Sequence, residues 1–189
     1  DFLYDMTAVP TQPLSALNTV YRAPGIGQIY ARSDWSPTAT WLNITAGPYT
    51  ESHAHRDQGS FLLFRDGWMA TDPNFFSHSG IRQEEELHNL VRIVDSGGDT
   101  VTQREGTTST LQALQQGAGW LHAAADSTAV YTATAGAPVQ RVEREWVYLA
   151  PDVVVVFDRV TTSPGTTQRW QLNTATLPTV AGATATVVD

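Results

Sequence analysis

The 189-residue sequence contains no cysteine and no lysine, so all 11 of its basic residues are arginines. Without cysteine, the chain can form neither a disulfide bond nor a thiolate-ligated zinc site, and any bound metal must be held by His, Asp or Glu side chains. The sequence also lacks a run of about 18 apolar residues, so we expect no membrane-spanning helix.

Positive charge is scarce as well, because 19 acidic residues against 11 basic ones give a formal net charge of −8. We therefore expect no nucleic-acid partner, since phosphate contacts require a basic surface. The same imbalance opposes the binding of any other polyanion. A polyanionic substrate would need a local basic site or a second domain to overcome the field of this one.

Helical periodicity is scarce along the whole chain. Short runs rich in Val, Thr, Tyr, Trp and Phe recur instead, separated by Gly, Pro and Asp. These runs predict strands near residues 27–32, 38–46, 59–65, 68–71, 89–94, 139–149, 153–160 and 167–172. Asp66-Gly67 is predicted to join two of them as a hairpin turn. The fold class is therefore all-β, an antiparallel β-sandwich of the supersandwich or jelly-roll kind with at most short helices.

Some segments carry more specific expectations. Val153–Phe157 is apolar at every position, which predicts a central strand covered on both faces. Gln83–Leu90 and Thr110–Gly117 are short amphipathic segments that could form helices. The stretch Ala123–Ala137, rich in Ala, Thr and Gly, is expected to hold loops and edge strands. The six tryptophans mostly fall within apolar strands, where core packing is their usual fate.

The side chains suited to chemistry gather before and after the Asp66-Gly67 hairpin. Residues two apart on an extended segment share a face, so His53, His55 and Asp57 would line one side. The return strand can bring Asp72 back beside His55, and His88 opens a later strand. Two imidazoles and one carboxylate suit zinc or another divalent metal. The alternative is that these residues are polar strand ends satisfied by backbone hydrogen bonds.

The remaining candidates have weaker patterns. His78 is an alternative to His88 as a metal ligand. His122 follows Trp120 as an isolated histidine and is expected to be structural. The run Glu84–Glu86 is expected to be a solvated face.

The stretch from Arg32 to His88 resembles the sandwich domain of the heparinase II/III-like polysaccharide lyases. The motifs that carry the resemblance occur in the family's order: Arg32-Ser33-Asp34-Trp35, Gly47-Pro48, His53-Ala54-His55-Arg56-Asp57-Gln58-Gly59-Ser60-Phe61, Asp66-Gly67, Asp72-Pro73-Asn74 and His88-Asn89. Residues 144–160 resemble the family's later hairpin, and residues 1–4 resemble the linker that leaves its helical domain.

The resemblance implies roles for individual residues. His55, Asp72 and His88 match the positions that bind a structural or substrate-organising zinc, and His53 matches a catalytic histidine in the substrate cleft. The implied reaction is β-elimination at a uronic acid, in which the carboxylate is neutralised, a base removes the C5 proton and an acid, commonly Tyr, protonates O4. The implied location is secreted or periplasmic.

The resemblance also implies partners, namely an acidic polysaccharide and a helical toroid domain that supplies the other wall of the cleft. Residues 1–20 would be the linker from that helical domain and residues 21–189 the sandwich domain, shortened at its C-terminus. Because the toroid is absent from this sequence, we expect the chain alone to be inactive. Two departures from the family pattern are the lack of Tyr in residues 73–87 and the presence of Asn173 where relatives often have His.

Two other classes stay open. Gly47, five residues and His53-x-His55 fit the opening of a cupin metal motif, although Gly59 and Ser60 stand where that motif wants a Glu. A non-catalytic carbohydrate-binding sandwich could use tryptophans as stacking platforms, and three or more exposed Trp in a line, with no metal, would favour it. A serine hydrolase is not supported, because no Gly-x-Ser-x-Gly elbow occurs.

Overall fold

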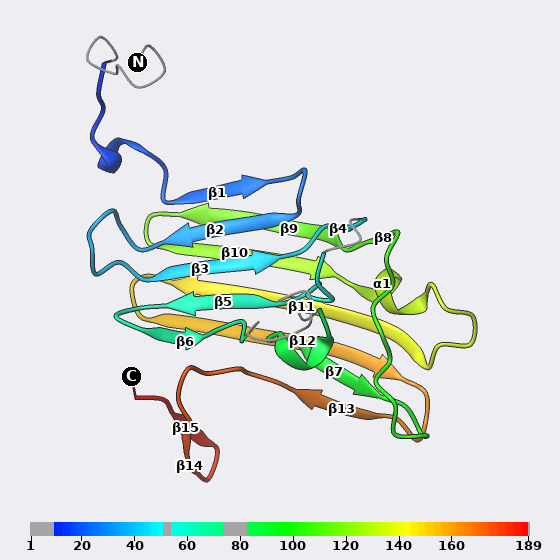
Figure 1. The fold of residues 1–189 in the computed structure, drawn as a ribbon. Coiled ribbons are helices and arrows are strands. Elements are labelled where there is room, and N and C mark those ends of the chain that lie inside the picture. Colours follow the sequence, from blue (N-terminus) through cyan, green and yellow to red (C-terminus); the bar gives the residue numbers. More distant parts are fainter. Residues whose placement is uncertain (1–9, 51–53, 74–82, 189) are drawn as a thin grey trace, which may run out of the picture.

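The computed structural model describes residues 10–50, 54–73 and 83–188, and within them two antiparallel sheets stack face to face (Figure 1). The front sheet has the order β1-β2-β3-β5-β6. Its strands are β1 (Val20–Ala23), β2 (Gln28–Arg32), β3 (Trp41–Thr45), β5 (Phe61–Phe64) and β6 (Trp68–Ala70). The back sheet has the order β12-β11-β10-β9. Its strands are β9 (Thr110–Gly117), β10 (Trp120–Asp126), β11 (Val139–Leu149) and β12 (Val153–Thr162).

Three small two-stranded sheets and a few short helical turns complete the described fold. The pairs are β4 (Pro48–Tyr49) with β8 (Thr107–Thr108), β7 (Val91–Val94) with β13 (Thr167–Trp170), and β14 (Thr179–Ala181) with β15 (Thr184–Thr186). The helical elements are α1 (Thr128–Thr132) and the 3-10 turns Leu14–Ala16 and Glu85–Leu87. All the strand pairs are antiparallel, which confirms the predicted all-β sandwich.

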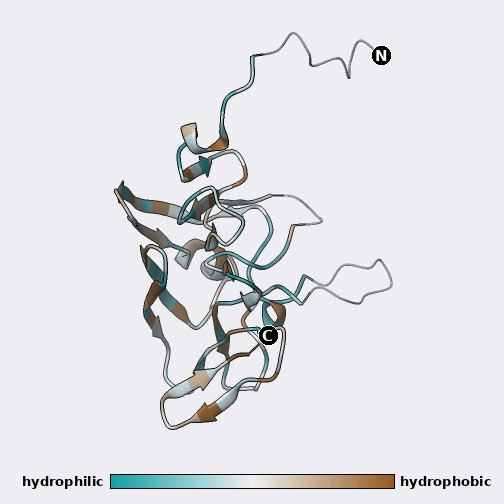
Figure 2. Cartoon of the chain, turned by 90° about the vertical axis from the view of Figure 1, so that its left-hand side faces the viewer, coloured by the Kyte–Doolittle hydropathy of each residue, from teal (hydrophilic) through white to brown (hydrophobic). Residues whose placement is uncertain are grey.

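The core lies between the two sheets and follows from strand alternation. Ile29 and Leu42 of the front sheet are buried, while their chain neighbours Tyr30 and Trp41 point to the other face and are exposed. Figure 2 shows the same alternation as changes of colour along the strands. The inward residues of both sheets form one cluster: Ile29, Ala31, Leu42, Ile44, Phe61, Leu121, Ala123, Ala125, Trp146 and Tyr148. Burial of this apolar surface is the main favourable term for the fold.

The hairpin prediction at Asp66-Gly67 is confirmed. Asp66 has a φ of 55°, and Arg65 donates a backbone hydrogen bond to Gly67 across the turn. Asp is one of the few residues with a side chain that tolerates this left-handed backbone. The turn returns the chain from β5 to β6 and so places Asp72 beside the end of β5 that carries the site.

The predicted central strand is wrong. β12 lies at the edge of the back sheet, and Val153, Val155 and Phe157 on its outer face are about half exposed. Its inner residues Val154 and Val156 pack against the core. An apolar run predicts burial on both faces, but within the described residues only one face of β12 is covered.

Two further expectations are overturned by pairing between distant segments. Thr110–Gly117 is a strand and not a helix, because it pairs along its length with β10. The expectation of loops and edge strands in Ala123–Ala137 is wrong for its first part, since Ala123, Ala124 and Ala125 lie in a central strand, whereas residues 133–138 do form a loop. Ala123 is the cross-strand partner of the fully buried Trp146, whose bulk fills the space that small side chains leave.

The expectation for the tryptophans holds only in part. Trp146 is fully buried, but Trp41, Trp68, Trp120 and Trp170 are 40–53% exposed. These tryptophans lie on the outward faces of their strands. Side chains alternate between the two faces, so apolar neighbours in sequence do not show that a tryptophan is buried. No helix in the described part of the chain is long and apolar enough to cross a membrane.

Candidate metal centre

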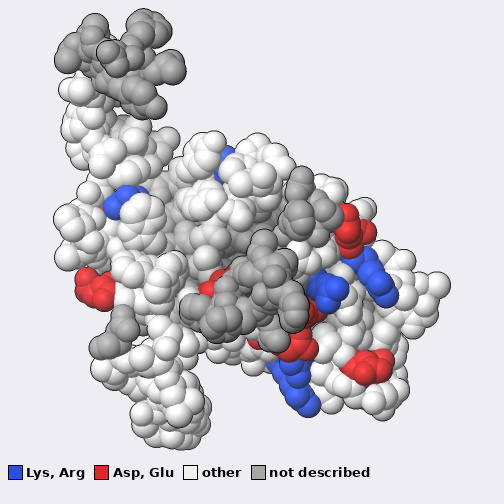
Figure 3. Space-filling view, viewed as in Figure 1, with Lys and Arg blue, Asp and Glu red and all other residues white. Residues whose placement is uncertain are grey.

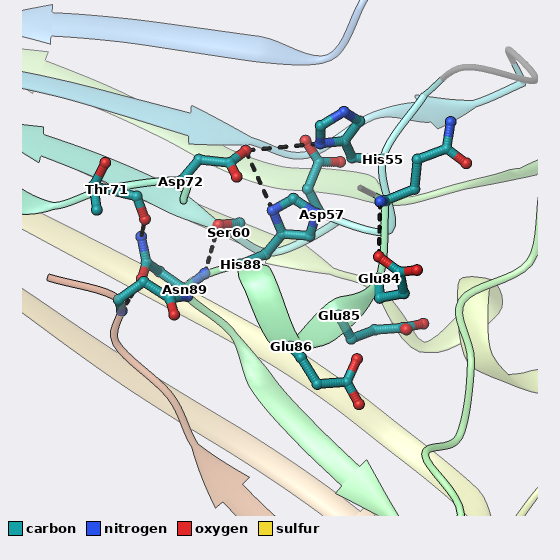
Figure 4. A network of polar contacts seen from close by, with 12 residues as sticks. His55, Asp57, Ser60, Thr71, Asp72, Glu84, Glu85, Glu86, His88 and Asn89 are labelled. Carbon is teal, nitrogen blue, oxygen red and sulfur yellow. Dashed lines mark hydrogen bonds and ion pairs between the residues drawn. The ribbon is translucent and has the colours of Figure 1, made fainter. Parts of the chain in front are cut away.

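Three of the four predicted site residues converge beside the front sheet (Figure 4). His55 lies in the loop before β5, Asp72 follows β6, and His88 follows the 3-10 turn Glu85–Leu87. The Asp72 Oδ2 atom lies 3.7 Å from His55 Nδ1 and 3.4 Å from His88 Nδ1. The two imidazole rings are 5.1 Å apart between centroids. The catalytic candidate His53 and the alternative ligand His78 lie outside the described residues.

The donor set fits a divalent metal. One ligand atom from each of His55, Asp72 and His88 lies within 4.8 Å of the others. Asp72 Oδ1 and His88 Nε2 are buried without a hydrogen-bond partner. Four other buried side-chain atoms of the described residues also lack partners, so these two support an ion only together with the convergence of the three donors. Two imidazole nitrogens and one carboxylate oxygen are a common zinc donor set that leaves a coordination position open.

The electrostatics of the cluster favour bound positive charge. Burial alone would raise the pKa of the Asp72 carboxyl, but its contacts with His55 and His88 outweigh burial and hold that pKa well below its usual value. The contact with Asp72 also raises the pKa of the His55 imidazole, against the effect of its own burial. Asp72 is therefore an anion that attracts a proton to His55 or a cation to the cluster.

Asp57 stands close to these residues but in a different environment. Burial raises the pKa of its carboxyl, and the nearby His88 and His55 only partly oppose that effect. The segment that carries His55 and Asp57 is a loop and not the expected extended segment, yet both residues line one hollow of about 440 Å³. Asp57 also lines a second hollow of about 120 Å³ together with Asp72 and His88.

Asn89 holds the segments of the site together. Its Nδ2 atom donates to the carbonyl oxygens of Phe61 at 2.8 Å and Thr71 at 3.0 Å. Its backbone N–H donates to Ser60 Oγ, and its Oδ1 accepts from the backbone N–H of Asn173. One buried amide thus fixes the positions next to Asp72 and His88. Asn173, the departure from the family pattern, joins this support through its backbone N–H and carbonyl.

Arg144 ties the site to the back sheet. Its guanidinium donates to the carbonyl oxygens of Gly59 at 2.8 Å and Asn89 at 2.6 Å, and it forms a bidentate pair with Asp158 at 2.6 and 3.0 Å. Sequence analysis assigned no such role to Arg144. The pairing could have been found from the sequence, because in a hairpin that turns at Pro151 and Asp152 the oppositely charged Arg144 and Asp158 lie opposite each other.

The prediction of a solvated face for Glu84–Glu86 is wrong at Glu85, which is only 1% exposed. Its Oε1 accepts a 2.6 Å hydrogen bond from the backbone of Gln103, and its Oε2 lies 3.8 Å from Arg56. Burial raises the pKa of this carboxyl. Gln103 in turn bonds to the backbone of Gln58 in both directions, so these contacts pin the loop that carries His55.

His122 takes no part in this cluster. It contacts Glu145 at 3.0 Å on the back sheet, and Glu145 also pairs with Arg159. Figure 3 shows charged side chains gathered on one side of the front face, while the rest of that face carries few.

No known family profile matches the sequence, and no curated protein matches it. Solved structures do match. A heparinase III gene product superposes with a TM-score of 0.61 at 17% identity, covering 76% of this chain and 22% of that one. Heparan sulfate lyase HepC from Pedobacter heparinus gives 0.59 at 19% identity, covering 77% and 22%. A further structure of heparinase III gives 0.56 at 17% identity, covering 77% and 23%.

The matched region thus spans just over a fifth of each of these lyases. At such identities the likeness is one of fold. The chain has the β-sandwich fold of the heparinase-like polysaccharide lyases.

Proposed function

We propose that this chain is the β-sandwich part of a polysaccharide lyase that cleaves uronic-acid-containing polysaccharides by β-elimination. The observation that carries the proposal is the convergence of His55, Asp72 and His88, with two buried polar atoms left without partners, in a fold shared with heparinase III and HepC. Zinc is the metal that this donor set suits best, and another divalent ion is the alternative.

When bound, the metal would supply positive charge that organises the cleft and offsets the charge of an anionic sugar. The chain's own residues prepare that position. Asp72 stays ionised because both imidazoles contact it. Asn89, the residue after His88, binds the Phe61 carbonyl, and Arg144 binds the Asn89 carbonyl, so the backbone that follows His88 is held in place before any ligand arrives.

The reaction would remove the C5 proton of a uronate and break the bond between C4 and O4. The electron pair left at C5 forms the C4–C5 double bond, and O4 leaves with a proton from an acid. We assign His53 to the uronate carboxylate, as the base or as a hydrogen-bond donor, because a neutral imidazole at pH 7 can serve in either way. The leaving-group acid, a Tyr in this scheme, would come from a helical domain.

That division of labour accounts for two features of the chain. The chain matches just over a fifth of each lyase, which leaves room for a helical partner domain in the working enzyme. Its net charge of −8 would repel an acidic polysaccharide unless the metal and the partner domain supplied positive charge. A secreted or periplasmic location fits such a substrate.

Metal content gives the first test. Purified chain loaded with zinc and dialysed should retain about one ion by elemental analysis, whereas His55→Ala and Asp72→Ala should retain far less. His122→Ala is the matched control, because it removes an imidazole from the back sheet. A wild-type content near zero, with folding intact, would leave only the structural interpretation of the cluster.

Catalysis gives the second test and requires the protein with its helical domain. Formation of unsaturated uronate is followed by absorbance on a panel of acidic polysaccharides. His53→Ala should lower turnover by about 10²–10⁴, the usual cost of losing one positioned acid or base, without changing metal content. Equal rates would remove His53 from the mechanism, and loss of metal would make it a ligand.

A further inference from the structure

Five aromatic side chains share the outer face of the front sheet. Register places Tyr21 opposite Tyr30, Trp41 opposite Phe64, and Phe64 opposite Trp68, so all five point away from the core. Tyr21, Tyr30, Trp41 and Trp68 are 38–65% exposed. Exposed aromatic surface on this scale is uncommon unless something binds to it.

Four of these residues, Tyr30, Trp41, Phe64 and Trp68, line a groove of about 620 Å³. The remaining lining residues are the amides Gln28 and Asn43 and the aliphatic Leu42 and Leu62, so none of the lining side chains is charged. Aromatic walls with a few polar groups are typical of small-molecule sites, whose volumes run from about 300 to 1,000 Å³.

The rings are held in position by their own neighbours. The Arg32 guanidinium lies 3.8 Å from the centroid of Trp41 and 4.2 Å from that of Trp35, so it covers one face of Trp41. Phe64 and Trp68 meet edge to face at 5.3 Å. A platform fixed in this way loses little conformational entropy when a ligand stacks on it.

The groove leads to the candidate metal centre. Gln28 lines the groove and both hollows beside His55 and Asp72, and Asn43 lines the groove and the smaller hollow. Tyr30 Oη and Asn43 Nδ2 both donate to Gln28 Oε1. A chain-like ligand on the metal centre would therefore extend over the aromatic rings.

We propose that Tyr30, Trp41, Phe64 and Trp68 form a subsite on which an unsulfated sugar of the polysaccharide stacks while the neighbouring uronate lies at the metal centre. This inference rests on the proposed function. A pyranose ring has an apolar face for the aromatic rings and hydroxyl groups for Gln28 and Asn43. A sulfate in the groove would lose its water and find no charged side chain in the lining to bind it, because Arg32 stacks on Trp41 and donates to backbone oxygens of Asp34 and Ser36.

The test is binding to the chain itself, measured by calorimetry and tryptophan fluorescence. The probes are an unsulfated hexasaccharide of glucuronate and N-acetylglucosamine and its sulfated counterpart of the same length. The unsulfated probe should bind more tightly. Trp41→Ala and Trp68→Ala should each weaken it by roughly tenfold or more, the usual cost of truncating a central aromatic contact.

Controls separate stacking from damage to the fold. Trp170→Ala removes an exposed tryptophan on β13, outside the groove, and should leave affinity unchanged. Trp68→Tyr keeps an aromatic ring and should restore most of the affinity, which a merely unfolded Trp68→Ala could not explain. Circular dichroism of each variant checks the fold.

Failure of the subsite and failure of the proposed function give different results. The subsite is overturned by any of three results: neither probe binds, both tryptophan variants keep the wild-type affinity, or the sulfated probe binds more tightly. If neither probe binds, the aromatic face is better explained as a surface that another part of the protein covers. The titrations are repeated after chelation. If the unsulfated probe still binds after chelation, yet the complete protein forms no unsaturated product, the subsite stands and the lyase assignment falls.

Discussion

Replacing Arg144 by Met should be among the most damaging single changes in this protein. The side chain is buried and its guanidinium makes four hydrogen bonds, two to Asp158 and one each to the carbonyl oxygens of Gly59 and Asn89. Met keeps the apolar length of the side chain but leaves a carboxylate and two carbonyls without partners. Removing one member of a buried ion pair typically costs about 3–5 kcal/mol. Domains are stable by only about 5–15 kcal/mol, so the loss should be a large fraction of the total.

Urea unfolding followed by tryptophan fluorescence measures the change, with a lower midpoint and an unchanged slope expected for Arg144→Met. Arg141→Met is the matched control on the same strand, because Arg141 is exposed and its pair with Glu143 is screened by solvent, so its loss should change the midpoint little. The double variant Arg144→Met with Asp158→Leu should recover part of the loss, since an entire buried pair can often be replaced at little cost. A loss below about 1 kcal/mol in the single variant would refute the reasoning.

The remaining predictions concern a close backbone contact, the metal and a buried acid. A Cβ on Gly47 would lie 2.2 Å from the Gly27 Cα, so Gly47→Ala should lower the melting temperature, whereas Gly25→Ala, with open space around it, should not. Zinc should raise the melting temperature of wild type, because a ligand of the folded state stabilises by mass action, and should not raise that of His55→Ala; equal shifts would argue against the site. Burial raises the pKa of Glu85, so its contribution to stability is present below the unfolded pKa and is lost as pH rises through the folded pKa. The urea midpoint of wild type should therefore fall as pH rises through this range, and in Glu85→Gln this part of the pH dependence should be missing.

Much of the fold and of the site could be predicted because the signals are local. Asp66-Gly67 specifies its own turn, and that turn returns Asp72 towards His55 whatever else the chain does. The order of motifs around His55 and His88 carried the resemblance to the lyases. The turn needed only neighbouring residues, whereas the assignment of His88 as a ligand depended on the resemblance.

The errors arose where the outcome depends on distant segments. Ala123 is buried because Trp146 of the next strand fills the space beside it, and the alanine gives no hint of that partner. Glu85 is buried where its carboxylate accepts a hydrogen bond from the backbone N–H of the distant Gln103, although its neighbours in sequence suggest a solvated face. Trp41 and Trp68 lie on the outward face of the sheet. The apolar composition of their segments does not show which residues of a strand point inwards and which point outwards.

The position of β12 has a practical consequence for anyone who handles this chain. The ten-residue β12 is an edge strand of the back sheet, and within the described part of the molecule no strand pairs with its free edge. Beside that edge stand Val153, Val155 and Phe157, with no lysine anywhere in the sequence to keep another strand away. A second molecule can continue the hydrogen-bond ladder where the first one stops. Protein concentration, more than temperature, should then decide how long a preparation stays monodisperse.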